Sequence, residues 1–298
     1  MPISRKDPRL QIGRLFTILF FASGSALMVV FSVKLISNSL ELAFTDFLLL
    51  VAGTLFVWIS FKFNFNKLIY STGGEHRINL IFFKIGIFIS SLIIILKVCA
   101  GSTSSYRRSL QEGGVIEWTS FLLLLLTAYI LLHCARSIRP TSLKIIFYFL
   151  SASCFVVAME EMSWGQMIFN WQTPAEISLI NAQGETNFHN IGFIDAHSDF
   201  AFGMILAVVI SISSLGDKFS RFAGKNFAVN LVAQIAPSKM LLIYFIPACI
   251  FSFCLYYDLH EFTRGFTFRG EEEIVEMLAA IGLLGYSTAM ASRFSNST

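Results

Sequence analysis

Two adjacent glutamates, Glu160 and Glu161, stand at the end of a long apolar run in the stretch FVVAMEEMSWGQMIFN, residues 155–170. Carboxylates beside hydrocarbon can bind a cation, share a proton or act as general acids and bases. On a helix, Glu160 would share a face with Ser163 and Trp164, whereas Glu161 would point elsewhere. We therefore expect the two acids to have different roles.

A second polar stretch, NAQGETNFHNIGFIDAHSDF, covers residues 181–200. Glu185 and His189 are four residues apart, so on a helix they could bind one ion together. His197 follows in the same stretch. The segment is too polar to cross lipid, and we expect it to form short helices that lie along the membrane.

A third polar stretch, YYDLHEFTRGFTFRGEEEIVEM, covers residues 256–277 and contains His260, Arg264 and Arg269. Its run of three glutamates suits the positive end of a helix dipole. Glu276 lies one turn deeper, where the chain should be entering hydrocarbon. Acids inside a membrane usually face a polar interior and have a function.

The composition makes lipid the solvent for much of the chain. Of its 298 residues, 55% are hydrophobic and only 14% are charged, and the mean hydropathy is +0.68. Soluble proteins carry roughly a quarter charged residues. The net charge is only +3 and the basic residues are scattered, so nucleic acid is not an expected partner.

Long apolar runs predict an all-α membrane protein, since a spanning helix needs about 20 mainly apolar residues. We predict a single integral membrane domain over residues 1–298, with a polar extracytoplasmic region around residues 160–199. The eight predicted spans are Leu15–Ile36, Phe44–Phe61, Ile78–Val98, Trp118–Cys134, Leu143–Met159, Phe200–Leu215, Met240–Tyr257 and Ile274–Ser292.

The distribution of charge supports eight spans with both termini in the cytoplasm, because cytoplasmic loops favour Lys and Arg. With this topology, all but six of the 22 basic residues lie on the inner side or at inner span ends, and all but three of the 19 acidic residues lie outside. Span five then runs outward from Lys144, which places Glu160 and Glu161 at the outer face. No Lys or Arg occurs between Lys144 and Lys218.

Three of the five histidines, His189, His197 and His260, lie in the same outer segments as the acids. Histidine is the commonest metal ligand among side chains, and three His, or two His with Glu, form a ligand set for catalytic zinc. The five cysteines show no C-x-x-C or zinc spacing, and no P-loop or G-x-S-x-G motif occurs. A divalent metal ion, namely zinc, iron or manganese, is the cofactor that this pattern indicates.

The candidate residues fall into three groups by expected role. The catalytic candidates are Glu160, Glu161 and Glu276. The metal-ligand candidates are Glu161, Glu185, His189, His197 and His260. The candidates for binding substrate are Trp164, Gln166, Asn187, Arg264 and Arg269.

The stretch EEMSWGQMIFNWQTPAE, followed by NAQGETNFHN, resembles a group of uncharacterised bacterial multi-pass membrane proteins with an EExSWGQ and NxQGExNxHN signature. The resemblance covers Glu160 to Asn190 and, more loosely, the glutamates that open the last span. It implies a bacterial inner-membrane protein, and it implies no particular activity.

The sequence thus favours a metal-dependent membrane enzyme, a hydrolase or transferase, that acts on a membrane lipid or lipid-linked substrate at the extracytoplasmic face. Two other functions stay open: a cation- or proton-coupled transporter with Glu276 as carrier, and a non-catalytic scaffold. A plain structural role for the acids also stays open, in which they mark the water-exposed ends of helices and their loops cap turns.

Overall fold

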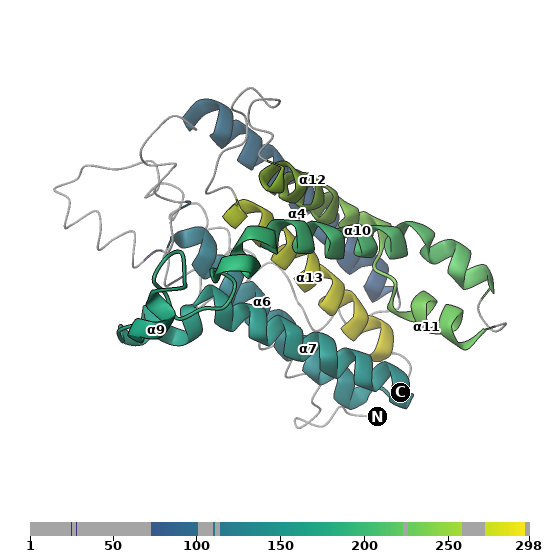
Figure 1. The fold of residues 1–298 in the computed structure, drawn as a ribbon. Coiled ribbons are helices and arrows are strands. Elements are labelled where there is room, and N and C mark those ends of the chain that lie inside the picture. Colours follow the sequence, from purple (N-terminus) through teal and green to yellow (C-terminus); the bar gives the residue numbers. More distant parts are fainter. Residues whose placement is uncertain are drawn as a thin grey trace.

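The computed structural model of the chain describes residues 73–100, 110, 114–222, 226–257 and 272–295, together with Ser25 and Met28. Six long helices make up most of this part (Figure 1). They are α4 (Gly74–Ala100), α6 (Val115–Ser137), α7 (Thr141–Glu161), α10 (Gly192–Phe222), α12 (Leu242–Tyr256) and α13 (Glu272–Ser295).

Shorter elements connect them. These are η1 (Ser163–Gly165), α8 (Gln166–Phe169), α9 (Ala175–Ser178), α11 (Phe227–Ile235) and η2 (Lys239–Leu241). The described residues contain no strand, and only an isolated bridge joins Asn181 to Ile191.

The predicted all-helical, membrane-type fold is confirmed in this part of the chain. Six helices are long and apolar enough to cross a membrane, α12 being counted together with η2. The six predicted spans from Ile78 to Ser292 each overlap one of them. The first two predicted spans, Leu15–Ile36 and Phe44–Phe61, fall outside the described residues, so the total of eight and the cytoplasmic termini stay predictions.

One predicted boundary was wrong. Span six was expected to begin at Phe200, but α10 begins at Gly192. Asp195 lies in its first turn, where the helix dipole favours an acid, and Ser198 donates a hydrogen bond to the Asp195 carbonyl 3.0 Å away. The polar residues His197 and Asp199 therefore lie on the first turns of a spanning helix and not in a loop.

The helices pack around α13, which contacts α4, α6 and α12 (Figure 1). A tight turn over residues 138–140 pairs α6 with α7 in antiparallel directions. The hydroxyl of Ser252, late in α12, donates to the carbonyl of Asp199, early in α10, at 2.9 Å, so these helices are antiparallel too.

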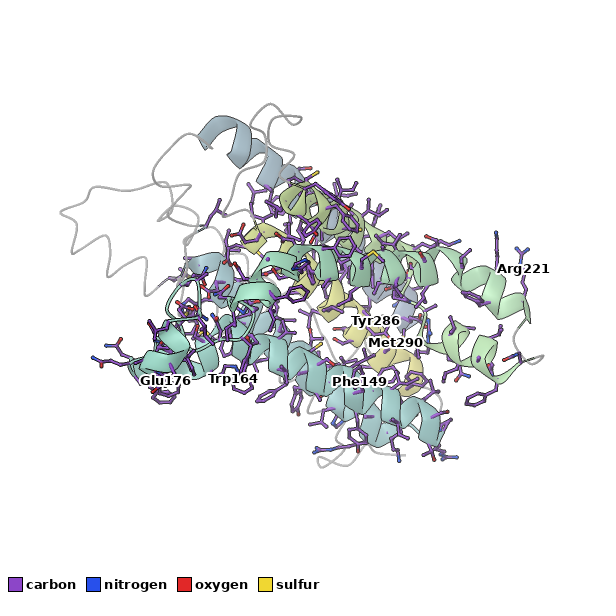
Figure 2. The ribbon with its side chains drawn as sticks, viewed as in Figure 1. Phe149, Trp164, Glu176, Arg221, Tyr286 and Met290 are labelled. Carbon is purple, nitrogen blue, oxygen red and sulfur yellow. The ribbon has the colours of Figure 1, made fainter. Side chains whose placement is uncertain are left out.

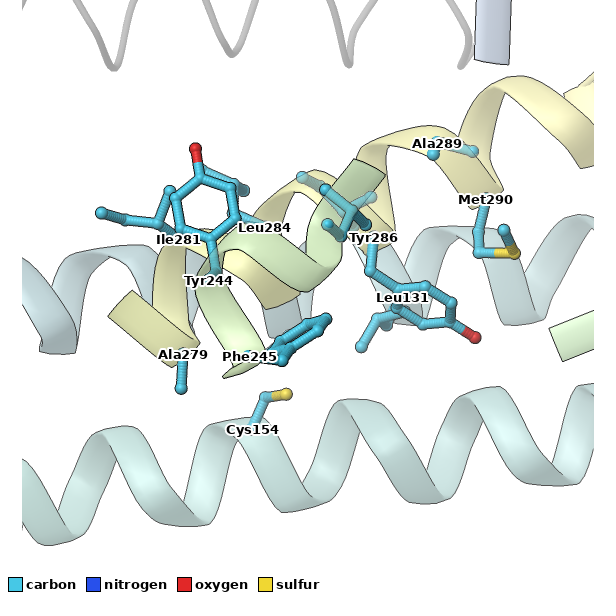
Figure 3. Close-up of a cluster of buried hydrophobic side chains, with 14 of the residues drawn as sticks. Leu131, Cys154, Tyr244, Phe245, Ala279, Ile281, Leu284, Tyr286, Ala289 and Met290 are labelled. Atoms are coloured by element: carbon cyan, nitrogen blue, oxygen red, sulfur yellow. The ribbon is translucent and has the colours of Figure 1, made fainter. Parts of the chain in front are cut away.

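Small residues let α13 approach its neighbours closely. In the core, Tyr244 and Phe245 of α12 pack with Ile281 and Leu284 of α13 (Figure 3). A Cβ atom on Gly282 would lie 2.6 Å from the ring of Phe245, so only glycine fits there. Small residues at helix contacts are typical of membrane proteins. Within lipid the hydrophobic effect does not bring helices together, so their association depends on close packing of the backbones.

An ion pair joins helix ends at one side of the bundle. The guanidinium of Arg293, near the end of α13, donates to both carboxylate oxygens of Glu75 in α4, at 3.0 and 2.5 Å. Its third hydrogen bond goes to the carbonyl of Gln234 in α11, at 2.6 Å. The start of α4 thus lies beside the end of α13, and the start of α13 lies at the opposite end of the bundle.

Candidate functional site

Three glutamates from two helices meet at that opposite end. Glu161 is the last residue of α7, and Glu273 and Glu276 lie in the first two turns of α13. One carboxylate oxygen from each lies within 4.8 Å of the other two. Glu161 is 8% exposed, so its carboxyl group is buried beside those of Glu273 and Glu276. We refer to these three residues as the glutamate cluster.

Further carboxylates surround the glutamate cluster. Glu117, near the start of α6 and 6% exposed, interacts electrostatically with both Glu161 and Glu276. Asp199 of α10 and Glu272 of α13 also interact with Glu276. Acidic side chains from four helices therefore lie at one end of the bundle. Positive charge, from a proton, a metal cation or a cationic group, must offset such a concentration of acids.

Glu160 has a different environment from its neighbour Glu161. Its carboxylate accepts hydrogen bonds from the indole N–H of Trp164 at 2.5 Å and from the backbone N–H groups of Phe188 and His189 at 2.7 and 3.1 Å. The His189 ring nitrogen Nδ1 lies 3.4 Å from the same carboxylate. Glu160 thus fastens the end of α7 to the following loop, while Glu161 faces the glutamate cluster.

The shared face that a helix would give Glu160, Ser163 and Trp164 does not form, because α7 ends at Glu161. Ser163, Trp164 and Gly165 all have left-handed backbone conformations, with φ of 45°, 56° and 97°. Such residues end an α-helix, and for the two non-glycine residues the conformation is strained. The chain therefore turns sharply after Glu161, which brings residues 163–191 back against the end of α7.

Side-chain hydrogen bonds hold this turn. The hydroxyl of Ser163, which is 1% exposed, donates to the carboxylate of Glu185 at 2.5 Å. The amide of Asn187 donates to the same carboxylate oxygen at 3.0 Å. The amide of Asn181 donates to the amide oxygen of Asn187 at 2.8 Å. Glu185 therefore provides the acceptor for two buried hydrogen-bond donors, Ser163 and Asn187.

A second set of bonds joins the same two stretches. The side-chain oxygen of Gln166 accepts from the backbone N–H of Thr186 at 2.8 Å, and its amide donates to the hydroxyl of Thr173 at 2.9 Å. The hydroxyl of Thr173 lies 3.2 Å from that of Thr186. The residues of the two signature stretches thus bond chiefly with one another.

The expected helix that would align Glu185 with His189 does not form, because residues 185–190 form an irregular loop. His189 lies beside Glu160, and His197 stacks on the ring of Phe193 in α10, with ring centroids 4.2 Å apart. Among the described residues, the group of acids and histidines close enough to hold a metal ion is the glutamate cluster, which includes no histidine. His260, Arg264 and Arg269 lie outside the described residues.

The structure thus divides the predicted site residues into two sets. Glu161 and Glu276 meet in the glutamate cluster, whereas Glu160, Trp164, Gln166, Glu185 and Asn187 build the loop beside it. Sequence reasoning missed Glu273 as a ligand candidate, although its spacing of three from Glu276 places both on one helix face. It also missed Glu117, for which no local pattern gives a signal.

No family model, curated protein or solved structure matches the chain. What the fold and the site define is a helical protein of membrane type, with an acidic cluster at one end of the bundle that could bind a metal ion.

Proposed function

We propose that the protein is a metal-dependent membrane enzyme, a hydrolase or transferase, whose metal ion is held by the glutamate cluster. The observation that carries the proposal is that oxygens of Glu161, Glu273 and Glu276 lie within 4.8 Å of one another at the end of two apolar helices. A divalent cation bound there would neutralise most of their charge, and it would fix α7 against α13.

The chemistry of the donors narrows the choice of metal. Zinc sites favour nitrogen and sulfur ligands, whereas carboxylates suit harder ions such as manganese. Among zinc, iron and manganese, we therefore favour manganese or ferrous iron. The metal would supply a polarised substrate oxygen or an activated water.

Glu117 is the candidate general base. It is buried, it interacts electrostatically with Glu161 and Glu276, and it is not among the three carboxylates that form the proposed ligand set. A carboxylate beside a metal-bound water can accept its proton. Arg264 and Arg269, in the chain that leads into α13, are proposed to bind a phosphate or carboxylate of the substrate.

The position of the glutamate cluster suggests the class of substrate, and the charge distribution suggests the side of the membrane on which the cluster lies. A site at the end of apolar helices is within reach of a lipid or lipid-linked substrate, and the charge distribution along the sequence supports an extracytoplasmic position for this end. We propose the plasma membrane of a bacterium as its location.

A proton- or cation-coupled transporter is the second candidate. The short separation between carboxylate oxygens of Glu161 and Glu276 favours it, because two acids this close can share a proton. Against it, the described part of α13 beyond Glu276 has no acid or base before Arg293 except Tyr286, and Leu278, Leu284 and their neighbours pack into an apolar core. The glutamate cluster therefore suits a site at one membrane face better than a path through the bilayer.

The test is metal content, measured by mass spectrometry on protein purified in detergent and incubated with manganese, ferrous iron or zinc. About one or two equivalents in the wild type, lost in Glu161→Gln and Glu276→Gln, would support the enzyme. Glu176→Gln is the matched control, because this glutamate is exposed in α9 at the same end of the molecule. Wild-type protein that binds none of the three metals would overturn the metal site, and proton-flux assays in liposomes would then test the transporter.

A further inference from the structure

The loop between α7 and α10 exposes an unusual amount of apolar surface. Its large side chains point outward at several places along the chain, namely at Ile168, Phe169, Leu179, Ile180 and Phe188, and Phe193 follows at the start of α10. Leu179 is 86% exposed and Phe193 is 77% exposed. Several large apolar side chains exposed on one segment indicate a contact with a membrane or with another protein.

The internal bonds of the loop explain why these side chains point outward. Its polar residues, among them Ser163, Glu185 and Asn187, bond inward to one another. The apolar residues are therefore left on the outside, which is the reverse of a loop folded for water. Trp171 and Phe169 stack with their ring planes 11° apart, as a paired aromatic unit on this outer surface.

The exposed surface continues the exposed apolar face of a helix that is long and apolar enough to cross a membrane. Phe155, Val156 and Val157, in the last turns of the apolar helix α7, are each about half exposed and lead directly to the loop. Figure 2 shows Trp164 and Glu176 of this region at one end of the molecule, opposite Arg221. Aromatic residues gather where a membrane meets water, and the loop stands at that level of the bundle.

We infer that residues 166–194 form an interfacial segment, immersed in the outer leaflet, with its apolar side chains among the lipid acyl chains. The partner is the hydrocarbon of the bilayer and not an anionic headgroup. The segment has two carboxylates, Glu176 and Glu185, and no Lys or Arg, so charge cannot attract it to anionic lipid. Its membrane contact should thus be independent of salt and of lipid charge.

Nitroxide labels at two neighbouring positions test this inference. Leu179→Cys and Glu176→Cys, each in a variant whose five native cysteines are alanine, are labelled and placed in phosphatidylcholine nanodiscs. We expect the label at position 179 to collide mainly with oxygen, which partitions into lipid, and the label at position 176 to collide more with a water-soluble nickel complex. The difference should persist when a third of the lipid is phosphatidylglycerol.

Two results would overturn the inference. A label at position 179 as accessible to nickel as the label at 176 would place the segment in water, and a label reached by neither reagent would place it against protein.

If the variant without cysteines does not fold, brominated phosphatidylcholine provides the second measurement. In the wild type it should quench part of the tryptophan fluorescence, and this quenched part should be missing in Trp171→Phe. An equal quenched fraction in the wild type and in Trp171→Phe would contradict immersion. Neither readout depends on the proposed metal.

Discussion

A carboxylate oxygen of Glu161, at the end of α7, lies within 4.8 Å of a carboxylate oxygen of Glu276, one turn into α13. The two residues lie on different helices, and Glu273 brings a third carboxylate to the same point. Carboxylates this close repel one another unless a proton or a cation lies between them. Their contact is therefore the feature from which a function of this protein has to be derived.

Metal binding to the glutamate cluster should stabilise the folded protein. A ligand at a hundredfold excess over its dissociation constant adds about 2.7 kcal/mol of stability. We expect manganese to raise the unfolding temperature of the wild type by several degrees in detergent, and EDTA to reverse the rise. Glu273→Gln should abolish the effect, whereas Glu176→Gln should keep it.

The affinity for the metal should fall as the pH falls. Protons and metal compete for the same carboxylate oxygens, so binding releases protons and weakens in acid. Titrations of manganese at pH 8 and pH 5.5, followed by calorimetry, check the sign. An affinity that does not change between the two values would speak against carboxylate ligands.

Glu160→Gln should loosen the interfacial segment and leave the glutamate cluster intact. The substitution removes the charge from an acceptor of three hydrogen bonds, and bonds to a charged group contribute roughly 1.5–3 kcal/mol each. Hydrogen exchange should become faster at the amides of Phe188 and His189. Metal content should stay at the wild-type level, and its loss would show that Glu160 acts on the metal as well.

Ser163→Ala should destabilise the protein by about 1–3 kcal/mol, because it removes a buried hydroxyl that donates to Glu185 and accepts from the amide of Asn187. Thermal unfolding in detergent measures the effect. The matched control is Ser198→Ala, since this hydroxyl is exposed and bonds only locally, to the carbonyl of Asp195. Equal effects of the two substitutions would contradict a special role for the bond between Ser163 and Glu185.

Arg293→Gln should weaken the opposite end of the bundle. The guanidinium joins α13 to both Glu75 and the Gln234 carbonyl. Because the pair with Glu75 is partly exposed, we expect a coupling energy of only about 1 kcal/mol in a double-mutant cycle with Glu75→Gln. Arg221→Gln, at an exposed position, serves as control. No change in metal content is expected, since this ion pair joins the helix ends opposite the glutamate cluster.

Much of the described fold follows from local properties of the chain. An apolar run of about 20 residues specifies a spanning helix wherever it occurs, because lipid leaves its backbone groups no other partners. The spans around Trp118–Cys134 and Leu143–Met159 were therefore predictable. The start of α10 was not, because Asp195 and Asp199 look like loop residues until their place on the first turns of a helix is known.

The sequence by itself determined that this is a helical protein of membrane type, and that its acids gather in a few segments. It also determined that Glu160 and Glu161 point in different directions, since adjacent residues on a helix must do so. Only the tertiary structure decided which acids meet. The left-handed residues Ser163 to Gly165 end α7 and fold the following loop back against it, so Glu185 bonds to Ser163 and His189 lies beside Glu160. The packing of α13 against α6 brings Glu273 and Glu276 to Glu161 and close to Glu117, and contacts between distant helices leave no trace in a local pattern.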